Sequence, residues 1–262
     1  MKERLDVLLV EKGFFTSREK AKASVMAGLI SVDGIRVDKA GNMTNPESVL
    51  SIKAPLCPYV SRGGLKLVKA IESFEIILNG KVAIDMGAST GGFTDCMLQN
   101  GAVKVYSMDV GYGQLDWKLR TDNRVVNMEK TNIRYLDTTA FPEKVDFISI
   151  DVSFISLNLI LPVAVALLKQ DGQVVCLVKP QFEAGREQVG KGGIVRDKKI
   201  HREVILKVIK YAENLSLYPN GLTYSPVTGA KGNIEYLLLL TKVNPPEPAI
   251  DVDMVIGETE NI

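Results

Sequence analysis

The sequence of 262 residues contains few of the residue types on which metal sites and disulfide frameworks depend. His201 is its single histidine, which excludes a site with several histidine ligands and leaves a Ser-His-Asp triad with one candidate. The three cysteines, Cys57, Cys96 and Cys176, are odd in number and far apart in the sequence, so they indicate neither a disulfide framework nor a CxxC zinc site. We therefore expect no metal and a reducing, cytoplasmic environment.

Long hydrophobic runs are also absent. The longest apolar stretch, Leu157 to Leu168, is interrupted by Asn158 and Pro162 and falls far short of the roughly 20 residues that a membrane-spanning helix needs. The amino terminus has no apolar core after its first charged residues, so the sequence predicts no secretory signal. These absences argue against a membrane protein and favour an ordinary globular one.

The chain as a whole is nearly neutral, but its two ends carry charge of opposite sign. The 32 basic and 31 acidic residues give a net charge of +1, which by itself argues against a nucleic-acid-binding protein. However, residues 1–70 hold 12 basic and 7 acidic residues, a net charge of +5, whereas residues 244–262 hold five acidic residues and no basic one. The basic first part implies moderate, structure-dependent binding to RNA.

The chain divides into parts of different composition. We predict a small α+β domain, a linker, a larger domain and an acidic tail, over residues 1–53, 54–60, 61–243 and 244–262. In the small domain, Asp33-Gly34 predicts a tight hairpin turn. Pro55 and Pro58 interrupt regular structure in the linker, and the three prolines and purely acidic charge of the tail predict that it is disordered or loosely attached.

Short apolar runs with β-branched residues alternate with helical patterns throughout the larger domain. Five of these runs predict parallel strands, at residues 82–84, 104–106, 124–126, 147–150 and 174–178. The alternation predicts a doubly wound α/β sheet. A final strand at Tyr236 to Leu240 follows a short irregular strand near Leu222 to Tyr224, and we expect this final strand to run antiparallel to the others.

A glycine-rich segment, Asp85 to Thr94, follows the first of these strands and opens a helix. Open α/β sheets bind nucleotides at this position, and glycine lets the backbone approach a ligand closely. The spacing is not GxGxxG, and Asp85 would repel a pyrophosphate, whereas Asp109, 24 residues later, is placed to bind two ribose hydroxyls. These features favour S-adenosylmethionine over a dinucleotide; the alternative is a tight turn that uses glycine only for packing.

The candidate cofactor contacts are residues of this loop and of the strand ends beside it. They are Asp85, Gly87, Ser89, Thr90, Gly91, Gly92, Phe93, Asp109, Met128, Glu129 and Asp151. Met128 and Glu129 follow the third strand, where a side chain could cover the adenine, but Met128 fits an ordinary core position equally well.

Four charged residues are predicted to meet at this edge of the sheet. Asp151 ends the fourth strand and Lys179 ends the fifth, where an unpaired charge after an apolar run would be costly. Lys66 lies on a helix that precedes the first strand, and Glu235 begins the last strand, which starts at the same edge if it is antiparallel. Each residue alone could be a solvated strand end, but together they predict a catalytic group of two lysines and two acids.

Such a group suits methyl transfer to a ribose hydroxyl. The 2′-hydroxyl is a very weak acid and a poor nucleophile, and in-line displacement at a sulfonium methyl depends strongly on orientation. A lysine held between acids can orient the hydroxyl and stabilise the developing alkoxide. We therefore expect Lys179 to steer the nucleophile, and the sequence leaves open whether it also removes the proton.

The motifs as a set resemble the TlyA family, also called hemolysin A. They are Asp85-Met-Gly-Ala-Ser-Thr-Gly-Gly-Phe-Thr, Ser61-Arg-Gly-Gly-Leu-Lys66-Leu, Asp151-Val-Ser-Phe-Ile-Ser, Lys179-Pro-Gln-Phe-Glu, Val189-Gly-Lys-Gly-Gly and Gly232-Asn-Ile-Glu235. The resemblance implies a Rossmann-like, S-adenosylmethionine-dependent methyltransferase domain similar to FtsJ-type enzymes, with their Lys-Asp-Lys-Glu tetrad at Lys66, Asp151, Lys179 and Glu235. It further implies 2′-O-methylation of ribosomal RNA at cytidine, in 16S RNA, 23S RNA or both. Where FtsJ-type enzymes often have aspartate after the third strand, this chain has Glu129.

The small domain resembles an S4 RNA-binding domain, on the residues Arg4-Leu-Asp, Ser17-Arg18, Ala21, Gly28 and Val32-Asp-Gly. Its candidate RNA contacts are Arg4, Arg18, Lys20 and Lys22, and such side chains fix the register on phosphates without reading sequence. A solvated face of mixed charge is the alternative, because Glu11 and Glu19 dilute the basic residues.

Three other functions compete with this prediction. A membrane-damaging hemolysin would fit the family's second name, but the sequence lacks a signal, a spanning segment and an evident basic amphipathic helix. An RNA-binding assembly factor with an inactive methyltransferase fold is disfavoured because all four tetrad positions are filled. A base or small-molecule methyltransferase is disfavoured by the tetrad and by the absence of an Asn-Pro-Pro-Tyr-like motif. A monomer that contacts ribosomal subunits is the default expectation.

Overall fold

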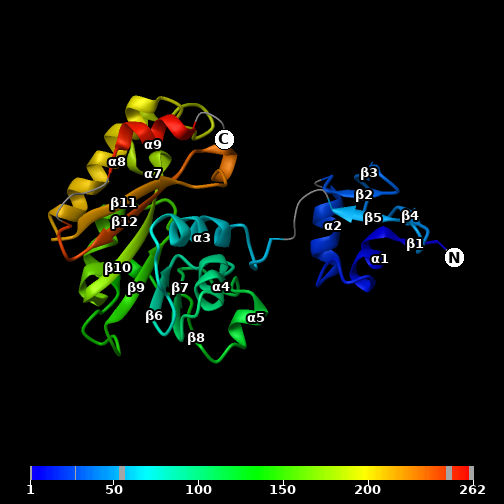
Figure 1. The fold of residues 1–262 in the computed structure, drawn as a ribbon, viewed down its shortest axis with the longest axis horizontal. Coiled ribbons are helices and arrows are strands. Elements are labelled where there is room, and N and C mark those ends of the chain that lie inside the picture. Colours follow the sequence, from blue (N-terminus) through cyan, green and yellow to red (C-terminus); the bar gives the residue numbers. More distant parts are fainter. Residues whose placement is uncertain (1, 27, 53–56, 246–249, 260–262) are drawn as a thin grey trace. The chain divides into compact units, whose positions relative to one another are not determined.

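The protein consists of two compact units, which are described here one at a time. A computed structural model describes residues 2–26, 28–52, 57–245 and 250–259 (Figure 1). The first unit spans Met1–Cys57 and the second Pro58–Ile262. The predicted linker over residues 54–60 falls partly outside the described residues. Val60, at its end, donates its backbone N–H to the Asp95 carboxylate of the second unit at 2.9 Å.

The smaller unit packs two helices on a small sheet. Its elements are β1 (Glu3–Arg4), α1 (Leu5–Glu11), α2 (Arg18–Met26), β2 (Ile30–Val32), β3 (Ile35–Val37), β4 (Met43–Thr44) and β5 (Leu50–Ile52). The sheet has the order β3-β2-β5, and β1 pairs with β4. Its core is the contact of Leu5 and Leu9 from α1 with Ala21 and Val25 from α2 and with Ile30.

Local sequence signals account for two of these boundaries. Asp33 and Gly34 both have positive φ, 51° and 79°, as a two-residue turn with the right twist for a hairpin requires, and β2 pairs with β3 as predicted. Ser17 precedes α2 and its hydroxyl accepts the backbone N–H of Lys20 at 3.3 Å, which satisfies one of the free N–H groups of the helix.

The larger unit is built on a seven-stranded sheet, which confirms the predicted α/β fold. The strands are β6 (Val82–Met86), β7 (Lys104–Met108), β8 (Val125–Met128), β9 (Val145–Ile150), β10 (Leu168–Val178), β11 (Tyr218–Tyr224) and β12 (Tyr236–Thr241). Their order is β11-β12-β10-β9-β6-β7-β8. The pairs among β6 to β10 are parallel, and β12 is antiparallel to β10 and to β11, as expected for the last strand.

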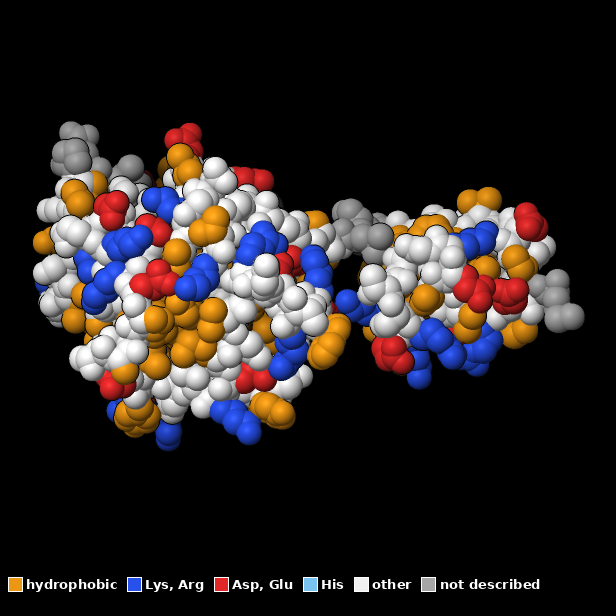
Figure 2. All heavy atoms as spheres, turned by 90° about the horizontal axis from the view of Figure 1, so that it is seen from below, with side chains coloured by type: hydrophobic (Ala, Val, Ile, Leu, Met, Phe, Trp, Pro, Cys, Tyr) orange, Lys and Arg blue, Asp and Glu red, His pale blue; other side chains and the backbone are white. Residues whose placement is uncertain are grey.

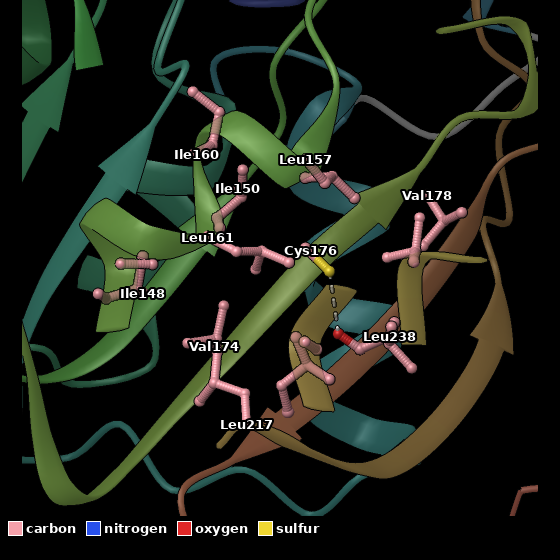
Figure 3. Close-up of a cluster of buried hydrophobic side chains, with 14 of the residues drawn as sticks. Ile148, Ile150, Leu157, Ile160, Leu161, Val174, Cys176, Val178, Leu217 and Leu238 are labelled. Carbon is pink, nitrogen blue, oxygen red and sulfur yellow. Dashed lines mark hydrogen bonds between the residues drawn. The ribbon is translucent and has the colours of Figure 1, made fainter. Parts of the chain in front are cut away.

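Helices cover both faces of this sheet (Figure 1). They are α3 (Gly63–Ser73), α4 (Gly92–Gln99), α5 (Trp117–Arg120), α6 (Leu161–Leu167), α7 (Pro180–Glu183), α8 (Lys198–Glu213) and α9 (Val252–Glu258), with short 3-10 turns η1 (Ile133–Tyr135), η2 (Leu157–Leu159), η3 (Arg186–Gln188) and η4 (Ala230–Gly232). Side chains from α3 and α4 pack on one face, and those from α6, α8 and α9 on the other. Figure 3 shows the second face, where Ile148 and Ile150 meet Leu161 and where Cys176 lies against the carbonyl oxygen of Leu238.

The register brings the ends of four strands to one edge. Met86 of β6 pairs with Ile150 of β9, and Cys176 of β10 pairs with the same residue. Val178, the last residue of β10, pairs with Tyr236, the first residue of β12. The residues that follow β9 and β10 and the residue that precedes β12 therefore stand side by side.

The prediction of a disordered or loosely attached acidic tail is wrong for the described part of residues 244–262. Residues 252–258 form α9, and Val252, Val255 and Ile256 are buried in the core on the face covered by α8. Their spacing gives an apolar stripe on one side of a helix, which the proline and acid content of the segment conceals. Asp251 caps the helix by accepting the backbone N–H of Met254 at 2.9 Å.

Candidate active site

The loop after β6 turns sharply because two of its glycines have left-handed torsions. Gly87 has a φ of 92° and Gly91 a φ of 94°, which glycine adopts without strain. A Cβ atom at Gly87 would lie 2.5 Å from the carbonyl oxygen of Asp151. Any side chain at Gly91 would collide with Leu119. Both glycines are therefore required by the path of the backbone.

Asp85, predicted to contact the cofactor, is instead wholly buried beneath the loop. Its Oδ2 accepts the backbone N–H of Thr94 at 2.8 Å and the hydroxyl of the same residue at 2.7 Å, and its Oδ1 accepts the hydroxyl of Ser149 at 3.2 Å. The carboxyl group thus fixes the first turn of α4 to the strand. Its place in the motif indicated proximity to the site but not the direction of its side chain.

Burial raises the pKa of Asp85 to about 7, although the hydrogen bonds from Thr94 and Ser149 oppose this shift. In the unfolded chain the group ionises near 3.8, so between about pH 4 and pH 7 the folded protein holds more protons. The contribution of this group to the free energy of unfolding therefore falls as pH rises through that window and is level above it.

We expect the variant Asp85→Asn to lack this fall, because its amide does not ionise. The difference from the wild type should grow by up to about 1.4 kcal/mol per pH unit between pH 4 and pH 7. Urea unfolding of both proteins at pH 5, 6, 7 and 8 measures it, with Asp171→Asn as a control on an exposed aspartate. Parallel pH profiles for wild type and Asp85→Asn would contradict the assignment.

A cavity of about 500 Å³ lies beside the loop at the ends of β7 and β9. Asp109, the residue after β7, lines it and accepts the backbone N–H groups of Ser89 at 2.8 Å and of Gly111 at 2.7 Å. These two bonds fix the carboxylate and leave it lone pairs for a ligand. The other lining residues include Val110, Gln114, Thr131, Asn132, Ile133, Val152, Phe154 and Ile160, none of which the sequence analysis predicted.

Met128 and Glu129, predicted to cover an adenine, do not line this cavity. Met128 packs against the hydrophobic core under α6 and α8. Glu129 accepts the backbone N–H groups of Gln114 and Leu115 and forms an ion pair with Arg120. Burial opposes its ionisation, but these hydrogen bonds prevail and lower the pKa of Glu129 to about 2. Glu129 thus holds the loop that forms the cavity wall, and Asn132 and Ile133, further along the chain, reach the cavity instead.

The four predicted catalytic residues meet in one chain of ion pairs. The Nζ atom of Lys179 lies 2.5 Å from Oδ1 of Asp151, and the Nζ atom of Lys66 lies 3.7 Å from Oδ2 of the same carboxylate. Lys66 also lies 2.6 Å from Oε2 of Glu235. Their side chains are between 3% and 21% exposed, so the charges interact where water screens them only weakly. The antiparallel direction of β12 is what brings Glu235 to this edge.

Three further groups hold the tetrad in place. Lys179 donates to the carbonyl oxygen of Val152 at 3.0 Å and to the hydroxyl of Ser153 at 3.3 Å. Gln181 donates its amide to Oε1 of Glu235 at 3.2 Å. The sequence analysis missed Gln181, whose only signal was its place two residues after Lys179 in a quoted motif.

Two cavities meet at the tetrad. One, of about 320 Å³, is lined by Lys66, Asp151, Lys179, Gln181, Glu235 and the aromatic rings of Phe154 and Phe182. Phe154 is 91% exposed with a left-handed φ of 63°, and its ring centroid is 4.9 Å from that of Phe182. The other, of about 480 Å³, contains Ser61, Arg62, Lys66 and Lys231 together with the predicted loop residues Gly87, Ser89, Thr90, Gly92 and Phe93.

The comparisons with known proteins agree with this geometry. The sequence profile of the FtsJ-like methyltransferases matches residues 59–242, more than two thirds of the chain, and that of S4 domains matches residues 3–49. The chain belongs to the FtsJ-like methyltransferase family. The 16S/23S rRNA (cytidine-2′-O)-methyltransferase TlyA of Mycobacterium tuberculosis is 42% identical over 238 residues, which are 90% of this chain and 89% of that protein. This relative places the chain in the TlyA branch of the family.

Two other relatives carry the family's second name. Hemolysin A of Brachyspira hyodysenteriae is 43% identical over 239 residues, covering 89% of this chain and 98% of that protein. The solved structure of a candidate hemolysin from Streptococcus thermophilus is 49% identical, with a TM-score of 0.79, and covers 99% of this chain and 96% of that one. Among the residues that the structure describes, no helix is long and apolar enough to cross a membrane.

The predicted RNA contacts lie in the S4 unit of this TlyA-family chain. Arg4 donates twice to the Asp6 carboxylate, at 2.9 and 3.0 Å, and Arg18 donates to it at 2.9 Å. These bonds, the one from Arg4 above all, lower the pKa of the buried Asp6 to about 2. Both arginines keep about half of their side chains exposed, and Lys20 and Lys22 are exposed on α2. Asp6 therefore fixes two arginines whose side chains remain partly exposed.

His201 takes no part in the FtsJ-like site. Its Nε2 lies 2.9 Å from the carbonyl oxygen of Val195, which can only accept, so Nε2 donates and Nδ1 accepts the hydroxyl of Tyr236 at 2.7 Å. Burial lowers the pKa of His201. Its role is structural, and within the described residues no cluster of three or more His, Cys, Asp or Glu side chains could hold a metal ion.

Proposed function

We propose that the protein transfers a methyl group from S-adenosylmethionine to a ribose 2′-hydroxyl of ribosomal RNA, at cytidine as in its named relatives. The observation that carries the proposal is the convergence of Lys66, Asp151, Lys179 and Glu235 beside the glycine-rich loop. Two lysines and two carboxylates suit the activation of a weakly acidic hydroxyl.

The cavities on either side of the loop fit the cofactor. The cavity with Asp109 offers a fixed carboxylate for ribose hydroxyls and apolar walls at Val110 and Ile133 for an adenine ring. Gly87 and Ser89 line this cavity and also the one that contains the tetrad, so that a single extended ligand can reach from one to the other. When bound, S-adenosylmethionine supplies a methyl group on a sulfonium, which is already activated for displacement.

The tetrad then has to orient the hydroxyl and stabilise its negative charge. The Nζ atom of Lys179 lies within hydrogen-bonding distance of three acceptors, on Asp151, Val152 and Ser153, which match the three donors of an ammonium group. The contact with Ser153, at 3.3 Å, is the longest, so an incoming hydroxyl oxygen can replace it. This geometry supports Lys179 as the group that holds the oxygen in line and stabilises the developing alkoxide, rather than as the base.

Aromatic and basic side chains at the rim support an RNA substrate. The exposed Phe154 and the half-buried Phe182 form an aromatic pair that lines the tetrad cavity, on which a nucleobase can stack. Beyond the cofactor cavity, the Lys130 ammonium lies 4.4 Å from the ring centroid of Tyr112, a side chain that is 72% exposed. Figure 2 shows Lys and Arg side chains standing among exposed hydrophobic ones on the face in view.

The test is methyl transfer from labelled S-adenosylmethionine by the purified protein. Small ribosomal subunits, large ribosomal subunits and naked ribosomal RNA serve as separate substrates. We expect label in the RNA of at least one of them, within a dinucleotide that resists alkali, because a 2′-O-methyl group removes the nucleophile that alkaline cleavage requires.

Other outcomes would contradict the proposal. Label that stays on a free base after digestion would indicate a base methyltransferase. Binding of ribosomal subunits with no methyl transfer to any substrate would indicate an assembly factor with an inactive site. Lysis of red cells by the pure protein, unaffected by a tetrad substitution, would support the hemolysin function instead.

A further inference from the structure

Two basic side chains at the rim of the cavity of about 480 Å³ have no acidic partner among the described residues. Arg62, the residue before α3, and Lys231, in the loop before β12, both line the cavity of about 480 Å³ that also contains Lys66. Both side chains belong to exposed residues, and no carboxylate of the described residues forms an ion pair with either. Most cations on a protein surface have no special role. Arg62 and Lys231 differ because both lie in the same concave site.

The charge balance of the site makes these cations stand out. In the tetrad, the two ammonium groups of Lys66 and Lys179 are balanced by the carboxylates of Asp151 and Glu235, so the net charge there is zero. Arg62 and Lys231 add two positive charges to the neighbouring cavity that nothing in the described site neutralises. The cavity also lies at the amino end of the 11-residue helix α3, where the helix dipole adds to the positive potential.

The loop that carries Lys231 is fixed to the tetrad. A side chain at Gly229 would collide with the Glu235 carboxylate, so the loop passes directly against that residue. The backbone N–H of Gly229 donates to the carbonyl oxygen of Asn233 at 2.8 Å, which closes the loop. Lys231 itself has a left-handed φ of 63°, a torsion that costs a lysine energy and that the closed loop holds in place.

We propose that Arg62 and Lys231 bind an RNA phosphate, the one attached to the 3′ oxygen of the nucleotide that is methylated. This inference rests on the proposed function. In an internal nucleotide the 2′-hydroxyl and the 3′-phosphate are attached to adjacent ribose carbons, so the phosphate must lie within a few ångströms of the reacting oxygen. This cavity and the tetrad cavity share four lining residues, Lys66, Gly87, Asp151 and Gly229. The proposed position of the phosphate is therefore next to the proposed position of the hydroxyl.

The cofactor's α-carboxylate is the other anion that could reach this cavity. The methionine end of S-adenosylmethionine carries a sulfonium and an ammonium as well as that carboxylate, so its net charge is positive. Two unbalanced cations would repel this end of the molecule, whereas they attract a phosphodiester, which is purely anionic. The positive charge of Arg62 and Lys231 therefore favours the RNA phosphate over the methionine end of the cofactor.

The experiment compares the variants Arg62→Gln and Lys231→Gln with wild type and with Lys210→Gln. Lys210 is an exposed lysine on α8 that has a carboxylate partner, Glu213, at 3.6 Å, which makes it a matched control. Initial rates of methyl transfer to ribosomal subunits are measured over a range of salt concentrations, and the affinity for S-adenosylhomocysteine is measured by calorimetry.

We expect Arg62→Gln and Lys231→Gln each to raise KM for the ribosomal substrate by roughly tenfold, as the loss of a charged hydrogen bond does. The salt dependence of kcat/KM should become less steep by about one unit of slope for each lost contact. Affinity for S-adenosylhomocysteine and the control variant should be unchanged.

Three results would overturn the inference. Unchanged KM and salt dependence in both variants would mean that neither cation binds the substrate. Weaker binding of S-adenosylhomocysteine with an unchanged KM for RNA would assign the cations to the cofactor's carboxylate. An equal effect of Lys210→Gln would show only a general response to lost positive charge. If the wild-type protein transfers no methyl group at all, the proposed function is refuted. That outcome is distinct from a failure of the phosphate site, which would leave the wild type active.

Discussion

The variant Lys179→Ala is expected to transfer methyl groups to ribosomal RNA about 100-fold more slowly than wild type, or slower still. Lys179 is 7% exposed and its ammonium lies 2.5 Å from Asp151, in the cavity that the glycine-rich loop also lines. Its removal takes away the group that orients the hydroxyl and stabilises its charge, and positioned catalytic groups of this kind contribute 10²–10⁴-fold. Single-turnover rates with labelled S-adenosylmethionine measure the loss.

The sheet itself offers a matched control for this variant. Lys169 on β10 and Asp146 on β9 form an ion pair at 2.8 Å near the start of those strands, at the opposite edge of the sheet from Lys179 and Asp151. We expect Lys169→Ala to keep nearly full activity, and both variants to bind S-adenosylhomocysteine like the wild type. A full rate for Lys179→Ala, or an equal loss for Lys169→Ala, would refute the proposed mechanism.

The variant Gly87→Ala is expected to bind S-adenosylhomocysteine at least 100-fold more weakly. The added Cβ would lie 2.5 Å from the carbonyl oxygen of Asp151, and a φ of 92° is strained for alanine. Both clashing groups belong to backbone that is fixed by pairing between β6 and β9, so neither can move aside without shifting the loop. Calorimetric titration measures the affinity, and thermal unfolding shows whether the variant is folded.

Gly80→Ala separates the effect of the collision from that of the torsion. Gly80 has a comparable φ of 74° in the turn before β6, but a Cβ there would meet nothing within 4 Å. We expect this control to be somewhat less stable and to bind the cofactor product normally. Equally tight binding of S-adenosylhomocysteine by Gly87→Ala and Gly80→Ala would contradict this prediction. It would mean that the close approach of Gly87 to Asp151 does not determine the shape of the binding site.

The parts of the fold that depend on local pattern could be predicted from the sequence. The alternation of apolar runs with helices gave the parallel sheet, and Asp33-Gly34 gave the hairpin, because both depend on neighbours in the chain. The acidic tail shows the limit of composition as a guide, because its helix depends on the spacing of Val252, Val255 and Ile256.

Site residues could be predicted where backbone position decides and not where side-chain direction does. Asp151 and Lys179 follow strands whose carboxyl ends must share an edge, so their meeting follows from topology. Asp85 and Glu129 are at positions next to the site, but hydrogen bonds from Thr94 and from the backbone of Leu115 turn their carboxylates into the protein. Asn132 and Phe154 reach the cavity from loops whose path the sequence did not reveal.

The sequence by itself determined the class of fold, the two-part organisation, the position of the glycine-rich loop and the four residues that meet beside it, because each of these depends on residue type and on order along the chain. Only the tertiary structure decided that the tetrad is a continuous chain of ion pairs and that Gln181 fixes Glu235. It also decided that Arg62 and Lys231 stand beside the tetrad with no acidic partner in the part of the chain that the structure describes. The physical reason is that charge balance in a cavity depends on groups from distant parts of the chain. Arg62 and Lys231 are separated by more than 160 residues in the sequence, and the fold brings them to the same cavity.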